Sequence, residues 1–502
     1  MERLRFVHSL GVYHLGEIAS TQIVKSLSEG EYSSLDCDWD KMKYIFLLAC
    51  LLHDVGHAPF SHTGEVFYKL HSKKGDMGNK NDEKDEDEIG TQELHERLSC
   101  LVDSDEFKKD IPIDSKSTAP HEIMSAIIGI KEFKKYIGAN SDCEFFARCI
   151  TGYRYKTKTT ENCIRNCFIS MLNSKVIDVD RLDYLIRDAY TSGYKTISID
   201  YYRLLKSLSV SNYLDKPYLV YRKDAVSVLE NVVYAHDSEK KWIQNHPIVV
   251  YEAYIITHML DFLEQNLKTK NSRLFSEKSL GVEGSILANE THVSLLCDDD
   301  VIYLSKNIYS DDLSDEFFSR NKRRHPVWKS EAEYRNFIVE GTKDSELKSL
   351  TECIKSLVGH VDFPNPVRIT PELVEKFEKE LTKSEAYEDS MVIAQKRKIS
   401  VCKYLCNYAD NHGFPCDYIF LPANIFLSNF SKDDLGKTLI YFGESETTEL
   451  RNVCSILSSK ESEKPLELYY LYYRKGRKSG DYTGQIDDIK EFCDGLKTAL
   501  KC

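Results

Sequence analysis

The sequence predicts a mainly α-helical protein, with a helical core in its N-terminal part and a smaller α+β region at its C-terminal end. The helices are predicted by apolar side chains that recur at helical spacing from about 120 to 265, and by further helical patterns within 330–410. The strands are predicted by the runs CDYIFLPANIFL, KTLIYFG and LELYYLYYRK after Gly413, which are rich in β-branched and aromatic residues.

In chain order, the first helices are expected at 1–28 and 40–53. The second helix contains the run YIFLLACLL, which is apolar on every side and therefore predicts a helix inside the core. Residues 71–90 are charged and nearly devoid of apolar side chains, which predicts a mobile insertion. A last helix is expected at 486–500, and the pattern over 268–325 predicts no particular element.

The length and composition predict several domains. The chain has 502 residues, of which 42% are hydrophobic, whereas single cores seldom grow beyond roughly 250 residues. We predict a helical core over 1–267, a mostly helical extension over 268–410 and a small α+β region over 411–502. The 15 scattered cysteines form no C-x-x-C pair, which favours reduced thiols over disulfides or a zinc ribbon.

The formal net charge of -13 argues against a general nucleic-acid or acidic-membrane surface, although it permits a local basic pocket. No apolar run reaches the ~18 residues of a membrane span, and the charged, amphipathic N-terminus does not resemble a signal peptide. We therefore expect a cytoplasmic protein that does not bind membranes. Nucleic acid is a possible partner that the composition does not indicate. A Walker loop and a G-x-G-x-x-G motif are both absent from the sequence.

Titratable side chains gather in LLHDVGHAPFSHTGE, at the end of the apolar helix. His53 and Asp54 offer an imidazole nitrogen and a carboxylate oxygen, which suit Fe, Mn, Zn or Mg. A lone His-Asp pair is weak evidence, because a histidine at a helix C-terminus is favourable without any metal. The signal is stronger here because His57 and His62 follow, after residues that end the helix.

Two other segments offer further ligands. His8 lies in RFVHSLGV, which predicts a helix. In IDVDRLDYLIRD, Asp180, Tyr184 and Asp188 recur every four residues, on the helix face opposite the apolar stripe that contains Leu182. For any one of these residues a solvated helix face remains the alternative.

The ordered set His8, His53-Asp54 and Asp180, with the motifs RFVHSLGV, LLHDVGHAPFSH and IDVDRLDYLIRD, resembles the HD-domain metal-dependent phosphohydrolases. Within them it looks most like the deoxynucleoside triphosphate triphosphohydrolases, and the resemblance covers roughly residues 3–265. It implies a helical HD-domain core in which these four residues bind a divalent ion: Mn, Mg, Fe, Zn or Co.

The resemblance also implies roles for residues around the metal. In HAPFSH it places His57 and His62 beside the phosphates, with Glu65 as an acidic partner, and the pair PHE supplies His121 as a further active-site histidine. It implies substrate contacts for Arg5, Tyr184 and Asp188.

Residues 240–245 fall where similar proteins hold phosphate- and sugar-binding side chains. Here Lys240 and Lys241 are the cations, with Gln244 and Asn245 nearby. We predict Lys240 and Asn245 as substrate contacts, with surface lysines as the alternative. The basic run SRNKRRH at 319–325 could steer an anion or an effector nucleotide, but a solvated charge run explains it better.

The expected activity is hydrolysis of dNTPs to deoxynucleoside and triphosphate. One alternative is an HD-type phosphatase or phosphodiesterase that acts on another nucleotide or on a nucleic-acid end. The other is a nucleotide-sensing module without turnover, against which the complete ligand set argues. The resemblance further implies a homo-oligomer and a possible nucleotide effector. Because relatives carry a segment before the first ligand, we expect either an upstream start or a pocket with an incomplete wall.

Overall fold

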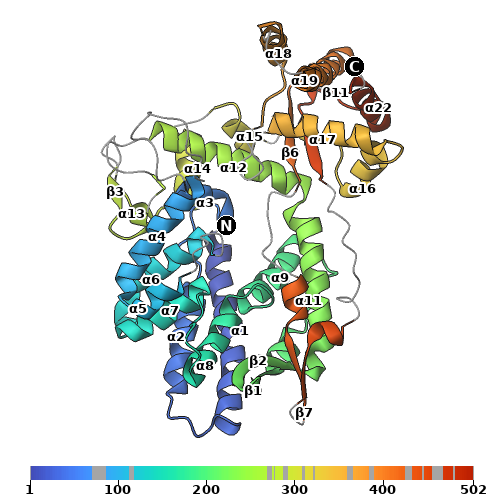
Figure 1. Ribbon diagram of the computed structural model, residues 1–502. Helices are drawn as coiled ribbons and strands as arrows, with labels where there is room; N and C mark the ends of the chain where they lie inside the picture. Colours follow the sequence, from blue (N-terminus) through green and yellow to red (C-terminus); the bar gives the residue numbers. More distant parts are fainter. Residues whose placement is uncertain are drawn as a thin grey trace. The chain divides into compact units, whose positions relative to one another are not determined.

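The computed structural model describes residues 2–69, 86–111, 118–267, 274–275, 277–286, 292–307, 311–319, 323–358, 366–383, 389–423, 432–443, 446–454, 467–478 and 481–500. Most of these residues lie in helices, with a few small sheets (Figure 1), so the predicted fold class is confirmed. No helix in the described part of the chain is both long and apolar enough to cross a membrane. The fourteen cysteines of the described part are all free thiols.

The chain forms two compact units, each built from several chain segments. Unit 1 contains Met1–Glu239, Leu260–Ser305 and Ser428–Ser462, and unit 2 contains Lys240–Met259, Lys306–Leu427 and Glu463–Cys502. Two helices, α12 (Pro247–Asn266) and α14 (Asp298–Asn307), continue from one unit into the other. Contacts group the chain into interleaved segments and not into consecutive ranges. The domain ranges 1–267, 268–410 and 411–502 stay a prediction.

Unit 1 is mostly helical. Its helices are α1 (Glu2–Glu29), α2 (Trp39–Leu52), α3 (His62–Lys69), α4 (Glu86–Val102), α5 (Asp105–Asp110), α6 (Pro120–Ile137), α7 (Asn140–Thr151), α8 (Thr160–Leu172), α9 (Val179–Ser192), α10 (Tyr201–Lys206), the 3-10 turn η3 (Lys223–Ala225), α11 (Val226–Glu239), α13 (Glu277–Leu280), α20 (Lys432–Gly436) and the 3-10 turn η7 (Leu450–Asn452). Of the predicted insertion 71–90, residues 71–85 lie outside the described residues, and 86–90 begin α4.

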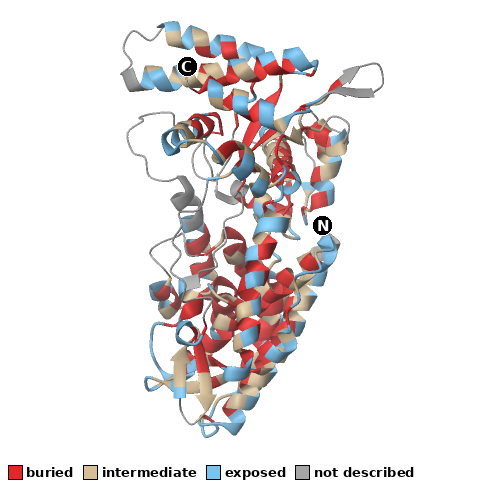
Figure 2. Cartoon of the chain, turned by 90° about the vertical axis from the view of Figure 1, so that its right-hand side faces the viewer, coloured by how far each residue is buried: buried red, intermediate tan, exposed pale blue. Residues whose placement is uncertain are grey.

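The helices predicted at 1–28 and 40–53 correspond to α1 and α2. Helix α2 begins where the Asp38 side chain accepts a hydrogen bond from Lys41 N at 2.9 Å, which satisfies one of the free amides of the first turn. Its apolar run is largely buried, and α1, α6, α7 and α8 all pack against it. Figure 2 shows buried residues on the inward faces of the helices and exposed residues on their outward faces. The hydrophobic run therefore places the end of α2 inside the helical core.

A four-stranded sheet completes unit 1, with the strand order β1-β2-β7-β8. Strands β1 (Leu208–Tyr213) and β2 (Lys216–Arg222) form an antiparallel hairpin that the sequence analysis did not predict. Strand β7 (Leu439–Gly443) runs parallel to β2 and pairs with the antiparallel β8 (Glu446–Glu449). A separate short hairpin joins β3 (Ser285–Ile286) and β4 (His292–Val293). The KTLIYFG strand thus belongs to the N-terminal unit.

Unit 2 has its own core around an antiparallel sheet, β5-β9-β6. Its elements are the π-helix η4 (Lys240–Gln244), α15 (Ser314–Phe318), α16 (Glu331–Tyr334), the π-helix η6 (Arg335–Val339), α17 (Asp344–Val358), α18 (Pro371–Lys383), α19 (Asp389–His412), α22 (Ile489–Ala499), β5 (His325–Pro326), β6 (Tyr418–Pro422), β9 (Tyr469–Tyr473), β10 (Gly476–Lys478) and β11 (Asp481–Gly484). The predicted strands in CDYIFL and LYYLYY correspond to β6 and β9, which pair over five residues.

The basic run 319–325 contributes to the packing of unit 2. Arg324 is buried, and its guanidinium pairs with Glu316 and, at 2.8 Å, with Asp417. Arg323 pairs with Glu252. Both arginines that the structure describes in this run therefore have carboxylate partners within the unit, which favours a structural role over the steering of an anion.

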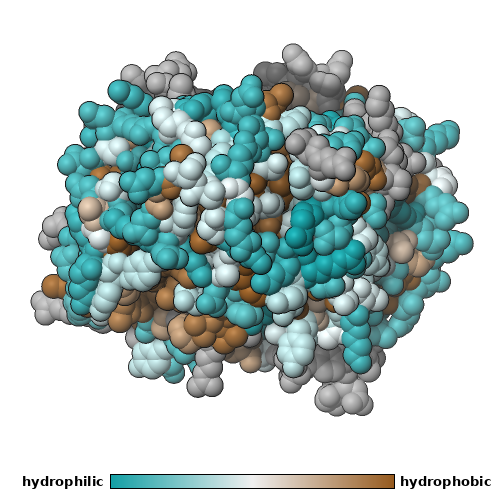
Figure 3. Space-filling view, turned by 90° about the horizontal axis from the view of Figure 1, so that it is seen from below, coloured by the Kyte–Doolittle hydropathy of each residue, from teal (hydrophilic) through white to brown (hydrophobic). Residues whose placement is uncertain are grey.

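On the face seen in Figure 3, hydrophilic side chains predominate and apolar side chains form separate groups.

Candidate functional site

The site begins where α2 ends. His53 is the C-cap of α2, and the following turn packs closely against α6, because Gly56 N donates to Ser125 Oγ at 2.8 Å. A Cβ on Gly56 would lie 2.2 Å from Ser125 N, so this approach requires glycine. Beyond it, Phe60 and Ser61 have positive φ values of 60° and 58°, which are unfavourable for side chains other than glycine. This turn leads directly to His62 and α3.

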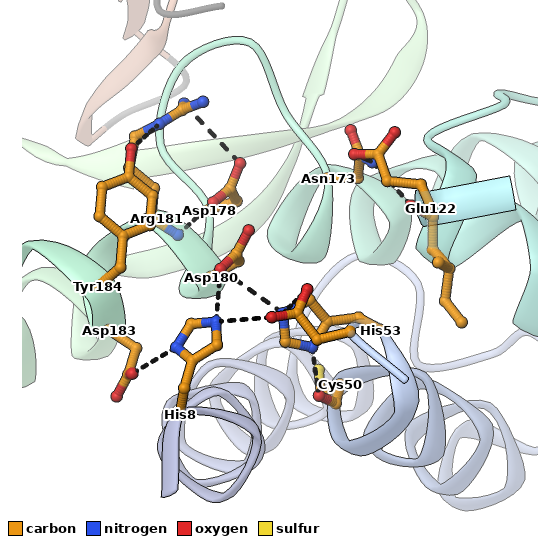
Figure 4. Close-up of polar contacts among 12 residues, drawn as sticks. His8, Cys50, His53, Glu122, Asn173, Asp178, Asp180, Arg181, Asp183 and Tyr184 are labelled. Atoms are coloured by element: carbon orange, nitrogen blue, oxygen red, sulfur yellow. Dashed lines mark hydrogen bonds and ion pairs between the residues drawn. The ribbon is translucent and has the colours of Figure 1, made fainter. Parts of the chain in front are cut away.

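The structure brings together the four predicted metal ligands from three helices. Figure 4 labels three of them, His8, His53 and Asp180. His8 comes from α1, the His53-Asp54 pair from the end of α2, and Asp180 from the first turn of α9. His8 Nε2 lies 3.0 Å from Asp180 Oδ1 and 3.5 Å from Asp54 Oδ2. His53 Nε2 lies 3.3 Å from Asp54 Oδ1 and 3.6 Å from Asp180 Oδ1. Two imidazole nitrogens and two carboxylates therefore converge on one point.

Hydrogen bonds on the far side of each imidazole fix its orientation. His8 Nδ1 lies 2.7 Å from Asp183 Oδ2, and His53 Nδ1 lies 2.9 Å from Cys50 O. Since these partners are acceptors, both Nδ1 atoms donate and both Nε2 atoms are free to face the carboxylates. Arg187 holds Asp183 with two hydrogen bonds of 2.8 Å. The sequence analysis did not single out Asp183. Residues three positions apart are neighbours on a helix, so its spacing from Asp180 could have indicated a place beside the site.

The charges in this cluster balance through protons when no cation is bound. Burial lowers the pKa of His8, but Asp180 and Asp183 outweigh burial and raise it to about 10. Burial likewise lowers the pKa of His53, and Asp54 and Asp180 raise it to about 9. Burial raises the pKa of Asp180, but the two histidines hold it well below its usual range. A divalent cation would replace these protons as the partner of the carboxylates.

The donor set fits a divalent metal ion. One ligand atom each of His8, His53 and Asp54 lies within 4.8 Å of the others, and Asp180 contacts both histidines. His53 Nε2 is buried and faces the carboxylates of Asp54 and Asp180 at 3.3 and 3.6 Å, so the three side chains are placed to share one ion. Mixed imidazole and carboxylate ligands suit Mn, Fe, Zn or Co. The protein would hold the ion through these four side chains.

A second cluster lies beside the first and centres on the buried Glu65. Its Oε1 atom lies 2.8 Å from His57 Nδ1 and 2.9 Å from His62 Nδ1, and its Oε2 atom lies 3.0 Å from His121 Nδ1. The His57 and His121 rings stack at 3.9 Å between centroids. His57 Nε2 lies 3.2 Å from Asp54 Oδ1, so His57 joins the two clusters. The structure thus gathers the three predicted catalytic histidines around the carboxylate of the fourth predicted residue, Glu65.

The histidines of the second cluster have pKa values shifted in opposite directions. Burial lowers the pKa of His121 to about 4, even though Glu65 opposes the shift. Burial also lowers the pKa of His62, but Glu65 outweighs it and raises the value to about 9. The His62 side chain is 62% exposed, so water screens part of this attraction. At neutral pH this combination favours a protonated His62, which can act as an acid, beside a neutral His121.

The residue after His121 has a different role. Glu122 is half-buried, and burial raises its pKa to about 8. Its carboxylate accepts hydrogen bonds from Ala119 N at 2.9 Å and from Asn173 Nδ2 at 2.8 Å. These bonds cap the start of α6 and tie it to the segment after α8. Glu122 therefore fixes the first turn of α6, from which His121 points to Glu65.

The predicted substrate contacts in unit 1 lie around the first cluster. Arg5 donates to Ser61 Oγ, in the turn that leads to His62. Tyr184 and Asp188 are half-buried on the same face of α9 as Asp180, and burial raises the pKa of both side chains. Arg181 Nε donates to the Tyr184 hydroxyl at 3.3 Å, an anchor for this side chain that the sequence analysis did not identify.

The two remaining predicted contacts belong to unit 2. Lys240 lies in η4, where the adjacent Lys241 pairs with Glu331 at 3.2 Å. Asn245 is buried, and its carbonyl accepts a hydrogen bond from the Tyr470 hydroxyl at 3.3 Å. These contacts describe structural roles inside unit 2, so a role of Lys240 and Asn245 in substrate binding stays a prediction.

Comparisons with known proteins agree with this arrangement. Residues 5–136 match the HD domain, a domain that binds divalent metal ions and is typical of metal-dependent phosphohydrolases. This match and the geometry of the clusters support the predicted divalent cofactor. The chain also resembles an uncharacterized protein of Mycoplasma pneumoniae, with 26% identity over 205 residues, which are 41% of this chain and 35% of that protein.

The uncharacterized protein YwfO of Bacillus subtilis is 24% identical over 264 residues, which are 53% of this chain and 46% of that protein. The chain thus spans less than half the length of these curated relatives. A crystal structure of a hypothetical protein from Aquifex aeolicus matches with 16% identity and a TM-score of 0.46, and the match covers 99% of this chain and 86% of that one.

Proposed function

We propose that this HD-domain chain is a divalent-metal-dependent phosphohydrolase that converts dNTPs to deoxynucleoside and triphosphate. The observation that carries the proposal is the convergence of His8, His53, Asp54 and Asp180 on one point, directly beside the histidines around Glu65. A site that only packs the core has no need of buried carboxylates and imidazoles in this arrangement, because burying them costs free energy.

The charge of the site supports a bound metal. Asp54, Asp180 and Glu65 all face it, and a triphosphate is itself highly anionic, so the ester would be repelled without cations. When bound, a divalent ion neutralises phosphoryl oxygens and lowers the pKa of a bound water. The side chains that face the site therefore fit a phosphate ester only together with a cation.

The chain's own side chains supply the proton transfers. In this proposal His62, held in its protonated form by Glu65, donates a proton to the leaving nucleoside oxygen. His121 stays neutral, and its ring stacks on His57 and keeps that ring between Glu65 and Asp54. Arg5 holds the turn before His62 through Ser61 and contributes a positive charge at the same place.

The choice of dNTPs rests on the resemblance of the sequence motifs and on the face of α9 that carries Tyr184 and Asp188. These two side chains lie one and two helical turns after the predicted ligand Asp180, on the same half-buried face of α9, so they could contact the sugar of a nucleotide held there. A second candidate is hydrolysis of another phosphate ester. It is favoured by one observation: Lys241, the cation next to the predicted substrate contact Lys240, pairs with Glu331.

The test is product analysis. The purified protein is incubated with each dNTP in the presence of Mn, Mg, Fe or Co, and the products are separated by anion exchange. We expect release of intact triphosphate, and its loss in Asp180→Ala but not in Asp36→Ala, which removes an exposed aspartate. Stepwise release of single phosphates would contradict triphosphate release and favour a phosphatase. Protein that binds no metal and hydrolyses no phosphate ester would contradict an enzyme and favour a sensing module.

A further inference from the structure

We propose that Asp298, which lies far from the site motifs in the sequence, is a positioning residue that holds the turn between His57 and His62. Asp298 is the first residue of α14, in the stretch 268–325 for which the sequence predicted no element. Its Oδ1 atom accepts a hydrogen bond from Phe60 N at 2.7 Å. The Asp298 side chain is buried, so this charge-assisted bond is shielded from water.

The turn needs such an anchor because its backbone is strained. Phe60 and Ser61 are consecutive residues with positive φ, and neither is glycine. Such conformations persist only where the surrounding structure fixes them. Within the turn, Ser61 N donates to Ala58 O at 3.0 Å, and the Arg5 side chain holds Ser61 Oγ from α1. The bond from Asp298 fixes the other strained residue, Phe60, directly through its backbone.

The turn determines where His62 lies. Since His62 follows Ser61 directly, a relaxed backbone at Phe60 and Ser61 would move its imidazole away from Glu65, 2.9 Å away. The metal ligands His53 and Asp54 precede the turn and are held by α2. Loss of the Asp298 bond would therefore impair proton transfer and leave metal binding intact. This consequence for catalysis rests on the proposed phosphohydrolase function.

The three consecutive aspartates at the start of α14 differ in what they contact. Asp300 caps the helix through a hydrogen bond from Cys297 N of 2.9 Å, and Asp299 is exposed. Only Asp298 of the three is buried, and its Oδ2 atom has no hydrogen-bond partner among the described residues. A carboxylate whose only task was to favour the helix N-terminus would be as effective when exposed. The burial of Asp298 fits a role toward the turn.

The experiment compares Asp298→Ala, Asp298→Asn and the exposed control Asp299→Ala in the full chain loaded with metal. Amide hydrogen exchange is measured at Phe60 and Ser61, and kcat and KM are measured with the substrate found above. Asparagine keeps an oxygen that accepts the Phe60 bond, so Asp298→Asn should rescue most of the loss and shows whether the fold tolerates the site. For Asp298→Ala we expect the amide exchange rate at Phe60 to rise and kcat to fall, each by about 10- to 100-fold. This is the range for a buried hydrogen bond to a charged group.

In the same variant KM and metal content should change by less than about threefold, because neither depends on the turn. Asp299→Ala should behave as the original protein. Unchanged exchange at Phe60 in Asp298→Ala would overturn the proposal. A fall of kcat in Asp299→Ala as large as that in Asp298→Ala would overturn it as well. An equal loss in Asp298→Asn would also overturn it, because the accepting oxygen is retained. If the original protein hydrolyses no phosphate ester, the proposed function fails, while the exchange data still decide whether Asp298 holds the turn.

Discussion

At the scale of single residues, the imidazoles of the first cluster depend on partners outside it. The ring of His8 presents Nε2 because its Nδ1 atom donates to Asp183, which Arg187 holds in turn. Gly11 makes room for this pair, since a Cβ there would lie 1.9 Å from Asp183 Oδ1. A metal site on this fold therefore needs Asp183 and Gly11 as well as its ligands.

Replacing Asp183 by asparagine should weaken metal binding without removing a ligand. Asparagine accepts a hydrogen bond less strongly and no longer balances Arg187, so His8 is oriented less firmly. We expect metal affinity to fall about 10- to 100-fold, as for other partners of ligating histidines. Isothermal titration calorimetry with Mn measures the change. Asp215→Asn, the same substitution in an exposed turn, is the control; equal affinities for all three proteins would contradict the orienting role.

The stability of the metal-free protein should fall as pH rises above neutrality. His8 and His53 have pKa values of about 10 and about 9 in the folded protein, against 6.5 as the ordinary value. A raised pKa stabilises the fold fully below about pH 6.5, and this stabilisation is lost as pH rises through 9 to 10. Urea unfolding in the presence of a chelator at pH 6.5 and 9.5 measures it. The free energy of unfolding should depend less on pH in Asp180→Ala, which lacks a carboxylate partner of both histidines. An equal pH dependence in that variant would show that His8 and His53 do not cause it.

The residues that the first cluster brings together were easier to predict from the sequence than the partners that hold them. His8, His53, Asp54 and Asp180 carry motifs with fixed local spacing, and the structure gathers them. Asp298 could not be predicted, because its bond to Phe60 joins segments 238 residues apart, and three adjacent aspartates look alike in the sequence. Hydrogen bonds that depend on tertiary packing leave no periodic signal.

At the scale of elements, the close approach of α2 and α6 holds the site on the helical core. Gly56→Ala should destabilise the fold, because the new Cβ would meet backbone atoms of Ser125 and Met124 at 2.2 and 2.6 Å, and backbone atoms cannot move aside cheaply. We expect a loss of about 1–3 kcal/mol in the free energy of unfolding, measured in urea. Ser125→Ala removes only the hydrogen bond to Gly56 N and should cost about 1 kcal/mol. A Gly56→Ala protein as stable as the original would contradict the crowding.

Strong periodicity or apolar runs made α1, α2 and α9 predictable. The β1-β2 hairpin was missed because its turn, Leu214-Asp215, lacks glycine and asparagine, the usual signals of a tight hairpin. Its two residues nevertheless have positive φ values of 52° and 60°. Strand β7 was predicted as a strand, but its partner β2 lies far away in the sequence, where local composition says nothing about pairing.

At the scale of the whole molecule, the described residues form two hydrophobic cores, one in each unit. The predicted metal ligands all belong to unit 1. We expect calorimetry to show two unfolding transitions, one for each unit. Bound metal should raise the midpoint temperature of the unit 1 transition and leave the unit 2 transition unchanged. Leu357→Ala, in the core of unit 2, should lower the free energy of unfolding of unit 2 by about 2–5 kcal/mol. A single transition that metal and this substitution shift equally would contradict independent cores.

The order in which the chain is made matters for the β1-β2-β7-β8 sheet. All proposed ligands and the hairpin are synthesised before Arg222, whereas β7 begins only at Leu439. During translation the outer edge of β2 therefore stays unpaired while most of unit 2 emerges, and an unpaired edge recruits other chains. Products that stop before β7 would carry the predicted metal ligands and still expose the unpaired edge of β2. On the ribosome, this edge is therefore the place where the growing chain can pair with another chain.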